Sequence, residues 1–156
     1  MPSLSLSLLR SLFLPPSRAA WLLGYGGLVP FVGLGAALWL LEGARQTQAL
    51  YALLAYGAVI LSFLGAIHWG LAMRDLRAPS ASSLSWGVIP GLLAWAALLC
   101  GTAIGMGLLA AGFWICFAVD SRVYPRFGLR AWLGMRLILT SLASLTCLAA
   151  AMGAGR

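Results

Sequence analysis

Long apolar stretches alternate with short polar gaps along the whole chain. Each stretch is close to the length of about 20 residues that an α-helix needs to cross a hydrocarbon core of about 30 Å with its backbone hydrogen bonds satisfied. The pattern predicts an all-α integral membrane protein that is a bundle of five transmembrane helices. We expect an N-terminal segment over residues 1–18 and a single transmembrane domain over residues 19–156. The five helices are expected at residues 20–41, 49–73, 84–101, 102–119 and 131–152.

Local irregularities are expected at three places in these helices. The boundary between the third and fourth helices carries no charge and must contain a tight turn around Gly101. Pro30 and Pro90 lie well inside the first and third helices. Each proline removes a backbone donor, so each should bend its helix.

The composition supports the membrane interpretation and indicates which classes of partner the protein binds. Hydrophobic residues make up 62% of the 156 residues, and the mean hydropathy is +0.98. The formal net charge is +7, but all ten basic residues are arginines and they form no continuous basic run. We therefore expect membrane lipids as partners and no nucleic acid.

The arginines also predict the orientation of the bundle. The N-terminal segment and the second and fourth gaps hold Arg10, Arg18, Arg74, Arg77, Arg122, Arg126 and Arg130. The opposite side receives Arg45 and Arg156. Because arginine is retained on the cytoplasmic side during insertion, we expect the N-terminus inside and the C-terminus outside.

The sequence also favours one membrane over another. It has no Lys or Asn and is rich in Ala, Gly, Leu and Arg, as expected of a GC-rich bacterial genome, which favours a bacterial cytoplasmic (inner) membrane. The first 18 residues contain Ser and Arg but no acid, a composition that also suits a mitochondrial presequence. A mitochondrial inner membrane is the alternative.

Four ionisable residues lie inside or at the edge of the expected helices, at a similar depth on the inner side. They are His68, Asp75, Asp120 and Arg136. Ionisable groups at such positions pair with one another or mark functional sites. We expect a polar intramembrane cluster that is either structural, joining helices, or functional, as a proton relay or a ligand site.

The fifth helix carries the most costly of these groups. Arginine at the centre of a bilayer costs about 2.5–3.5 kcal/mol, and less near an interface that its side chain can reach. Arg136 therefore either pairs with an acid or extends to lipid phosphates. Thr140 and Ser144 continue its face in steps of four residues.

The second helix has two distinct faces. Small residues recur every four positions at Ala58, Ser62, Ala66 and Gly70. Such a stripe lets another helix approach closely, so we expect helix packing there. His68 lies on roughly the opposite side.

A family resemblance rests on this second helix. Residues 56–70, which end in His68-Trp69-Gly70, resemble the signature of the family of domain of unknown function 3429, which includes the eukaryotic transmembrane protein 69. The segment at 86–90 and the segment at 132–140 are also similar to the family pattern. The resemblance implies a small multi-span protein found in bacteria and mitochondria. It brings no established activity and no catalytic residue.

The remaining polar residues do not form a recognised catalytic or metal-binding pattern. One histidine cannot supply both axial ligands of a bis-histidine haem, and one histidine with three scattered acids is too sparse for a catalytic metal site. Cys100, Cys116 and Cys147 show no C-x-x-C spacing and are interpreted as small apolar residues. We therefore expect no cofactor and no enzymatic activity.

Three functions remain after these exclusions. The first is a non-enzymatic accessory or assembly factor that binds another membrane protein complex or forms a homo-oligomer. The second is a small transporter or proton-conducting module that uses the polar cluster. The third is a quinone- or lipid-binding protein.

Overall fold

The computed structural model describes residues 17–74 and 81–153, and every regular element in these ranges is a helix. Five helical stretches are long and apolar enough to cross a membrane. The all-helical, five-span prediction agrees with this finding. Residues 1–16 of the expected N-terminal segment, Asp75, Arg77 and Arg156 lie outside the described residues.

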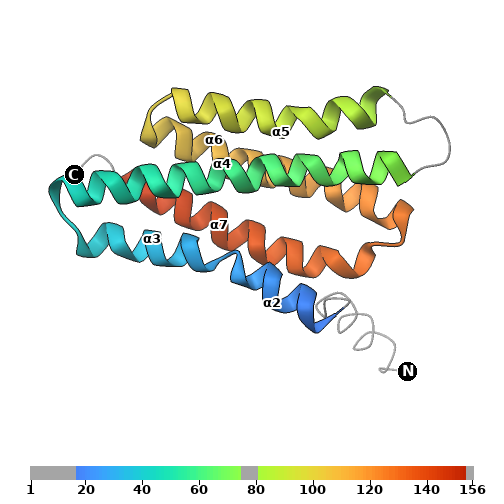
Figure 1. Ribbon diagram of the computed structural model, residues 1–156, viewed down its shortest axis with the longest axis horizontal. Coiled ribbons are helices and arrows are strands. Elements are labelled where there is room, and N and C mark those ends of the chain that lie inside the picture. The colour runs from blue at the N-terminus through green and yellow to red at the C-terminus, as the bar shows by residue number, and fades with distance from the viewer. Residues whose placement is uncertain (1–16, 75–80, 154–156) are drawn as a thin grey trace.

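The helices follow one another through short connections (Figure 1). They are α2 (Arg18–Gly26), α3 (Val29–Leu40), α4 (Gly43–Arg74), α5 (Ala81–Leu99), α6 (Thr102–Val123), the 3-10 turns η1 (Tyr124–Phe127) and η2 (Arg130–Trp132), and α7 (Leu133–Gly153). The largest difference from the expected bounds is at α4, which begins at Gly43 instead of residue 49. The first turns of α4 are polar, so the helix extends beyond the apolar stretch from which its bounds were predicted.

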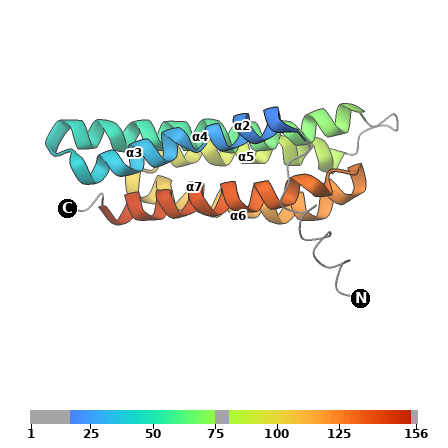
Figure 2. The same cartoon turned by 90° about the horizontal axis from the view of Figure 1, so that it is seen from below.

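The bundle has two layers (Figure 2). One layer contains α2, α3, α4 and α5, and the other contains α6 and α7. The strongest packing joins α4 to α5 and α6 to α7. Helix α2 begins at one end of the bundle and α7 ends at the other (Figure 1).

The first span is interrupted between α2 and α3. Pro30 lies in the first turn of α3, where a proline is tolerated because that turn lacks intrahelical partners. The hydroxyl of Tyr56 on α4 donates to the carbonyl of Gly27 at 2.8 Å, which satisfies a backbone acceptor at the break. Helix α3 packs against α4 and α7, whereas α2 touches α7 only lightly. The expected irregularity is therefore present as a two-residue interruption at Gly27 and Leu28, which both keep helical backbone angles.

Helices α4 and α5 approach closely on a side of α4 that includes part of the predicted stripe, since a Cβ at Gly91 on α5 would lie 3.8 Å from Oγ of Ser62. A Cβ at Gly65 would lie 2.7 Å from the carbonyl oxygen of Gly87 and 3.2 Å from Pro90. Of the stripe residues, Ala58 is buried and Ser62 is half-buried. Ala66 and Gly70 are exposed, because the His68 side of α4 faces the bundle and turns them outward. The expected bend at Pro90 is contained within α5, which continues through it.

The predicted turn between the third and fourth spans is present. Helix α5 ends at Leu99 and α6 begins at Thr102. Gly101 has φ +78°, a conformation that a side chain disfavours. Glycine at this position permits the chain to reverse within two residues.

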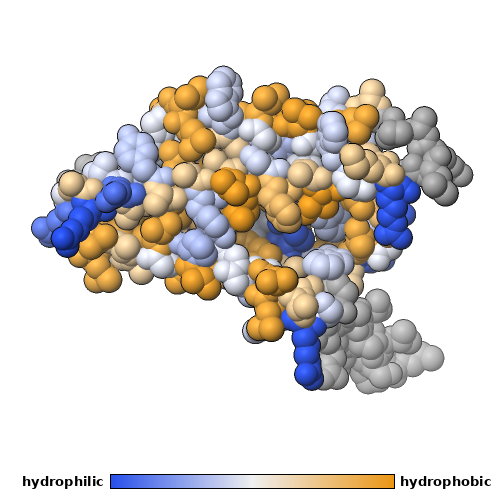
Figure 3. Space-filling view, in the orientation of Figure 1, coloured by the Kyte–Doolittle hydropathy of each residue, from blue (hydrophilic) through white to orange (hydrophobic). Residues whose placement is uncertain are grey.

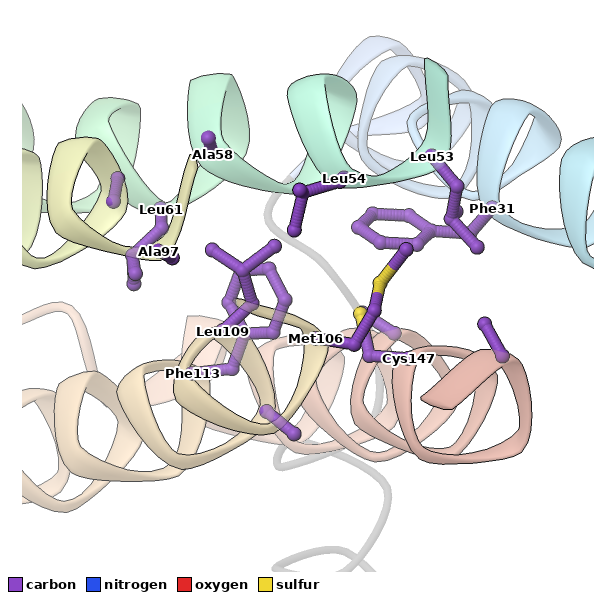
Figure 4. Packing of buried hydrophobic residues seen from close by; sticks show 14 of the residues in the cluster. Phe31, Leu53, Leu54, Ala58, Leu61, Ala97, Met106, Leu109, Phe113 and Cys147 are labelled. Carbon is purple, nitrogen blue, oxygen red and sulfur yellow. The ribbon is translucent and has the colours of Figure 1, made fainter. Parts of the chain in front are cut away.

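An apolar core joins the two layers (Figure 4). Phe31 of α3 meets Phe113 of α6 edge to face, with ring centroids 6.0 Å apart. Leu53 and Leu61 on α4 are fully buried against the other layer. This core holds the middle of the bundle and leaves the polar residues toward one end.

The exposed arginines mark that end. Among the described residues, it contains Arg18, Arg74, Arg122, Arg126 and Arg130, which lie where α2 and η2 begin, in the last turns of α4 and α6, and in η1. Arg45 lies near the start of α4, at the other end. The end-to-end asymmetry expected from the sequence is therefore present in three dimensions.

Candidate functional site

Three of the four predicted ionisable residues meet inside the bundle. His68 comes from α4, Asp120 from the last turn of α6, and Arg136 from the first turn of α7. His68 precedes Arg74 by six residues, so it lies about 9 Å along α4 from the arginine-rich end. Asp75 falls outside the described residues.

Asp120 occupies the centre of this cluster. Its Oδ1 lies 2.8 Å from Nε2 of His68, which donates its N–H to the carboxylate. Its Oδ2 accepts two hydrogen bonds from Arg136, from Nε at 2.9 Å and from Nη2 at 2.8 Å. Both carboxylate oxygens are thus engaged by side chains from two other helices.

The cluster is almost completely removed from solvent and lipid. Asp120 is 1% exposed, and His68 and Arg136 are also buried. A charge buried at this depth requires a paired and hydrogen-bonded partner. Arg136 meets that requirement inside the protein and does not extend to lipid phosphates. The cluster therefore ties α4, α6 and α7 together at one end of the bundle.

The other two residues of the family-like motif, Trp69 and Gly70, follow His68 in the sequence but do not take part in the cluster. Trp69 donates its indole N–H to the carbonyl of Leu84 at the start of α5, at 2.9 Å. Its ring lies against Gly87, where any Cβ would collide with it. Gly70 is exposed and has open space at its Cβ position. The motif thus combines a cluster residue, a clamp onto α5 and a small surface position.

Two aromatic residues near His68 were not predicted as part of the site. Tyr124 is 4% exposed, and its ring centroid lies 6.4 Å from that of His68. Its spacing of four residues from Asp120 is the sequence signal that places it on the same face. The ring of Trp86 meets that of His68 edge to face, with the ring centroids 6.3 Å apart.

A cavity of about 550 Å³ lies beside the cluster, between α2, α3, α4, α6 and α7. Most of its wall is apolar and includes Phe31 and Phe113. Its rim includes Leu23 of α2 and Phe63 of α4, which are 79% and 60% exposed. The cavity therefore opens at the side of the bundle, where α2 departs from it. Figure 3 shows a hollow in this region, with hydrophilic atoms at its bottom and hydrophobic atoms around it.

Three polar side chains interrupt the apolar wall of the cavity. They are Tyr124, Arg136 and Thr140. His68 and Asp120 do not line the cavity and lie behind Arg136. The site is an apolar chamber with a few hydrogen-bonding groups toward one end, the general form of a small-molecule site.

Metal-binding geometry is not found in the part of the chain that the structure describes. No group of three or more His, Cys, Asp or Glu side chains lies close enough to hold a metal ion there. Cys116 and Cys147 are buried separately, and Cys100 is exposed at the turn before α6.

Comparison with known proteins connects this arrangement to a family. The model of the family described as protein of unknown function (DUF3429) matches residues 16–152. The chain belongs to the DUF3429 family. The matched range contains the buried cluster, the cavity and all five spans except the last residue of the fifth. The resemblance expected from the His68-Trp69-Gly70 segment is therefore confirmed.

A curated relative extends the comparison. Transmembrane protein 69 of Xenopus tropicalis is 35% identical over 131 residues, which cover 81% of this chain and 51% of the relative. The chain thus spans about half the length of this relative. No solved structure matches the chain. The relative and the five apolar helices together identify a multi-pass membrane protein of unknown activity.

Proposed function

We propose that this protein binds a lipid-like molecule, a lipid or a quinone, inside the bilayer and performs no enzymatic chemistry. The observation that carries the proposal is the cavity of about 550 Å³, which lies within the range of about 300–1,000 Å³ typical of small-molecule sites. Its apolar wall suits a ligand already dissolved in the membrane. Its rim of exposed Leu23 and Phe63 gives such a ligand an entrance from the side.

The geometry of the buried cluster favours a ligand-binding function over a proton-conducting one. A relay requires a group that can exchange a proton with a neighbour on each side. Asp120 instead directs both oxygens to fixed donors on two helices, which is the arrangement of a structural clamp. The clamp fixes the wall of the cavity, because Arg136 belongs to both.

Filling the cavity tests the proposal. Ile67 lines the cavity from α4 and is half-buried, so Ile67→Trp adds bulk inside it. Val59 is 64% exposed on the same helix, and Val59→Trp adds similar bulk outside. We expect native mass spectrometry of protein released from nanodiscs to show a bound apolar molecule in the wild type and in Val59→Trp. We expect at least a tenfold lower bound fraction in Ile67→Trp. Equal occupancy in both variants, or no adduct in the wild type, overturns the proposal.

A second candidate is the accessory or assembly role, in which the protein contacts another membrane complex or a second copy of itself. It is supported by Ala66 and Gly70, which are exposed on α4 and offer a neighbouring helix a close approach. A stoichiometric complex recovered in mild detergent from wild type and Val59→Leu, but lost in Gly70→Leu, would support this role. Recovery of no complex from the wild type contradicts it.

We also propose that the arginine-rich end of the bundle faces the cytoplasm of a bacterial cell, with the N-terminus inside and the C-terminus outside. The positive-inside rule supports this orientation, because all but one of the described arginines outside the core lie at that end. A mitochondrial inner membrane, with the same end facing the matrix, is the alternative location.

A further inference from the structure

The cavity beside α2 reaches the arginine-rich end of the bundle. Its wall there includes Ala20 near the start of α2, and Leu129 and Trp132 just before α7. From Trp132 the wall continues along α7 to Ala143, a rise of about 16 Å. One leaflet of a bilayer with a hydrocarbon core of about 30 Å contributes about half of that thickness. The cavity is therefore about as long as one leaflet is thick.

Two exposed arginines lie at one level at this end of the cavity. Helices α2 and α7 both begin at the arginine-rich end, and they meet where a Cβ at Gly24 would lie 2.8 Å from Sδ of Met135. Arg18 precedes Gly24 by six residues, which places it about 9 Å from this contact toward the arginine-rich end. Arg130 precedes Met135 by five residues, a similar distance of about 8–9 Å. We call Arg18 and Arg130 the arginine pair.

The arginine pair has no counter-ion in the part of the protein that the structure describes. Both side chains are exposed. The ion pairs among the described residues all involve Asp120, which is buried and holds His68 and Arg136. Glu42, the other acid in the described ranges, lies before α4 at the opposite end. The arginine pair therefore attracts an anion from the membrane surface.

An anion is favoured at the end of the cavity and disfavoured inside it. Arg136 is the charged residue in the cavity wall, and Asp120 already supplies its counter-ion. An anion inside would lose its hydration without gaining a free cation. At the arginine pair it can keep part of its hydration and pair with exposed cations. A fitting ligand thus has a charged group at the end of the cavity and an apolar remainder inside.

We propose that the ligand is an anionic glycerophospholipid, with one acyl chain in the cavity and its phosphate at Arg18 and Arg130. This inference rests on the proposed binding function and names the class of lipid. An acyl chain matches the length of the cavity, because chains of the same kind form the leaflet beside it. A quinone carries no charge and gains nothing from the arginine pair. A zwitterionic phospholipid brings an ammonium group that the arginines repel.

Two lipids with identical acyl chains isolate the effect of headgroup charge. Palmitoyl-oleoyl phosphatidylglycerol is anionic, and palmitoyl-oleoyl phosphatidylcholine is zwitterionic. Full-length protein is placed in nanodiscs that contain equal amounts of both, and native mass spectrometry after release measures which lipid stays bound. We expect the wild type to retain phosphatidylglycerol over phosphatidylcholine by about tenfold or more, because two arginines act on the headgroup. Equal retention of the two lipids overturns the inference.

Arg18→Gln and Arg130→Gln each remove one charge from the end of the cavity. Each should lower the preference for phosphatidylglycerol about fivefold. Arg122→Gln is the matched control, because Arg122 is exposed at the same end but follows the cavity residue Phe113 by nine residues. Nine residues are about two and a half helical turns, so Arg122 lies on the opposite side of α6.

We expect Arg122→Gln to keep the wild-type preference. All three variants should unfold at the wild-type temperature, because each replaces an exposed side chain that forms no ion pair with a described residue. An equal loss of preference in Arg122→Gln and Arg130→Gln would indicate a diffuse attraction to the whole arginine-rich end. That result overturns the inference.

Ile67→Trp tests whether the headgroup and the chain in the cavity belong to one molecule. It should lower retention of phosphatidylglycerol, whereas Val59→Trp should retain it as the wild type does. Phosphatidylglycerol that is retained equally by both variants lies outside the cavity, and this outcome overturns the inference. A native adduct with the mass of a quinone or an uncharged lipid also overturns it and leaves the binding function standing. If there is no native adduct and neither lipid is retained, both proposals fail.

Discussion

Asp120 is the residue on which the polar interior depends. It accepts from His68 and twice from Arg136, and all three side chains are buried. Such a cluster need not add net stability over a well-packed apolar one, because each ion loses its solvation. Removing one partner is different, since the remaining charge stays buried without compensation.

Asp120→Asn should lower the free energy of unfolding by about 3–5 kcal/mol, because it leaves the Arg136 charge buried without its counter-ion. The measurement is unfolding in mixed micelles with increasing SDS, followed by circular dichroism. Glu42→Gln is the control, since Glu42 is exposed at the other end of the bundle and should change stability little.

The double variant Asp120→Leu/Arg136→Met distinguishes an unpaired charge from lost packing. It removes both charges, so it should regain most of the stability lost in Asp120→Asn. A double variant less stable than the single one would show that the cluster itself contributes the stability.

The depth of the three cluster residues in the membrane was predictable from the sequence, whereas the side chains around them were not. His68, Asp120 and Arg136 stand out because ionisable groups are rare in apolar helices, and counting residues from the arginine-rich gaps gives their level. The roles of Tyr124 and Thr140 depend on which helix faces meet across the bundle. A single sequence with many interchangeable apolar residues leaves that open.

At the scale of the helices, α4 shows that a stripe of small residues can be packed at one end and exposed at the other. Ser62 and Gly65 both face α5, and Ala58 one turn before Ser62 is buried in the bundle. His68 is buried against Asp120 and lies on the opposite side of the helix from Ala66 and Gly70. The end of the stripe at Ala66 and Gly70 is consequently turned outward.

Gly65→Ala should destabilise the packing of α4 against α5 by about 1–3 kcal/mol, because its Cβ would lie 2.7 Å from the backbone oxygen of Gly87. Gly70→Ala is the matched substitution on the same helix, and it has open space. Thermal unfolding in detergent should show a lower midpoint for Gly65→Ala and an unchanged or higher one for Gly70→Ala. Equal midpoints for the two variants would mean that α4 and α5 can move apart at Gly65 without loss of stability.

At the scale of the whole molecule, the number of spans was predictable because bilayer thickness dictates helix length. The interruption between α2 and α3 was predicted as a bend at Pro30, whereas the hydrogen bond from Tyr56 to the Gly27 carbonyl could not be read from the sequence. The cavity beside α2 was not predicted, because it arises from the separation of that segment from its neighbours.

Cys100 gives a direct measurement of orientation. It is exposed at the turn between α5 and α6, opposite the arginine-rich end, whereas Cys116 and Cys147 are buried. A membrane-impermeant maleimide added outside spheroplasts should label the wild type and leave Cys100→Ser unlabelled. Labelling that requires disruption of the membrane would reverse the proposed orientation.

The position of the cavity rim determines which ligand concentration sets the occupancy of the site. With Leu23 and Phe63 at the entrance, a ligand reaches Arg136 by diffusing in two dimensions among acyl chains, without passing through water. Occupancy then follows the mole fraction of the ligand among the lipids. Diluting a vesicle suspension with buffer leaves the site filled, while fusing the same vesicles with ligand-free lipid empties it.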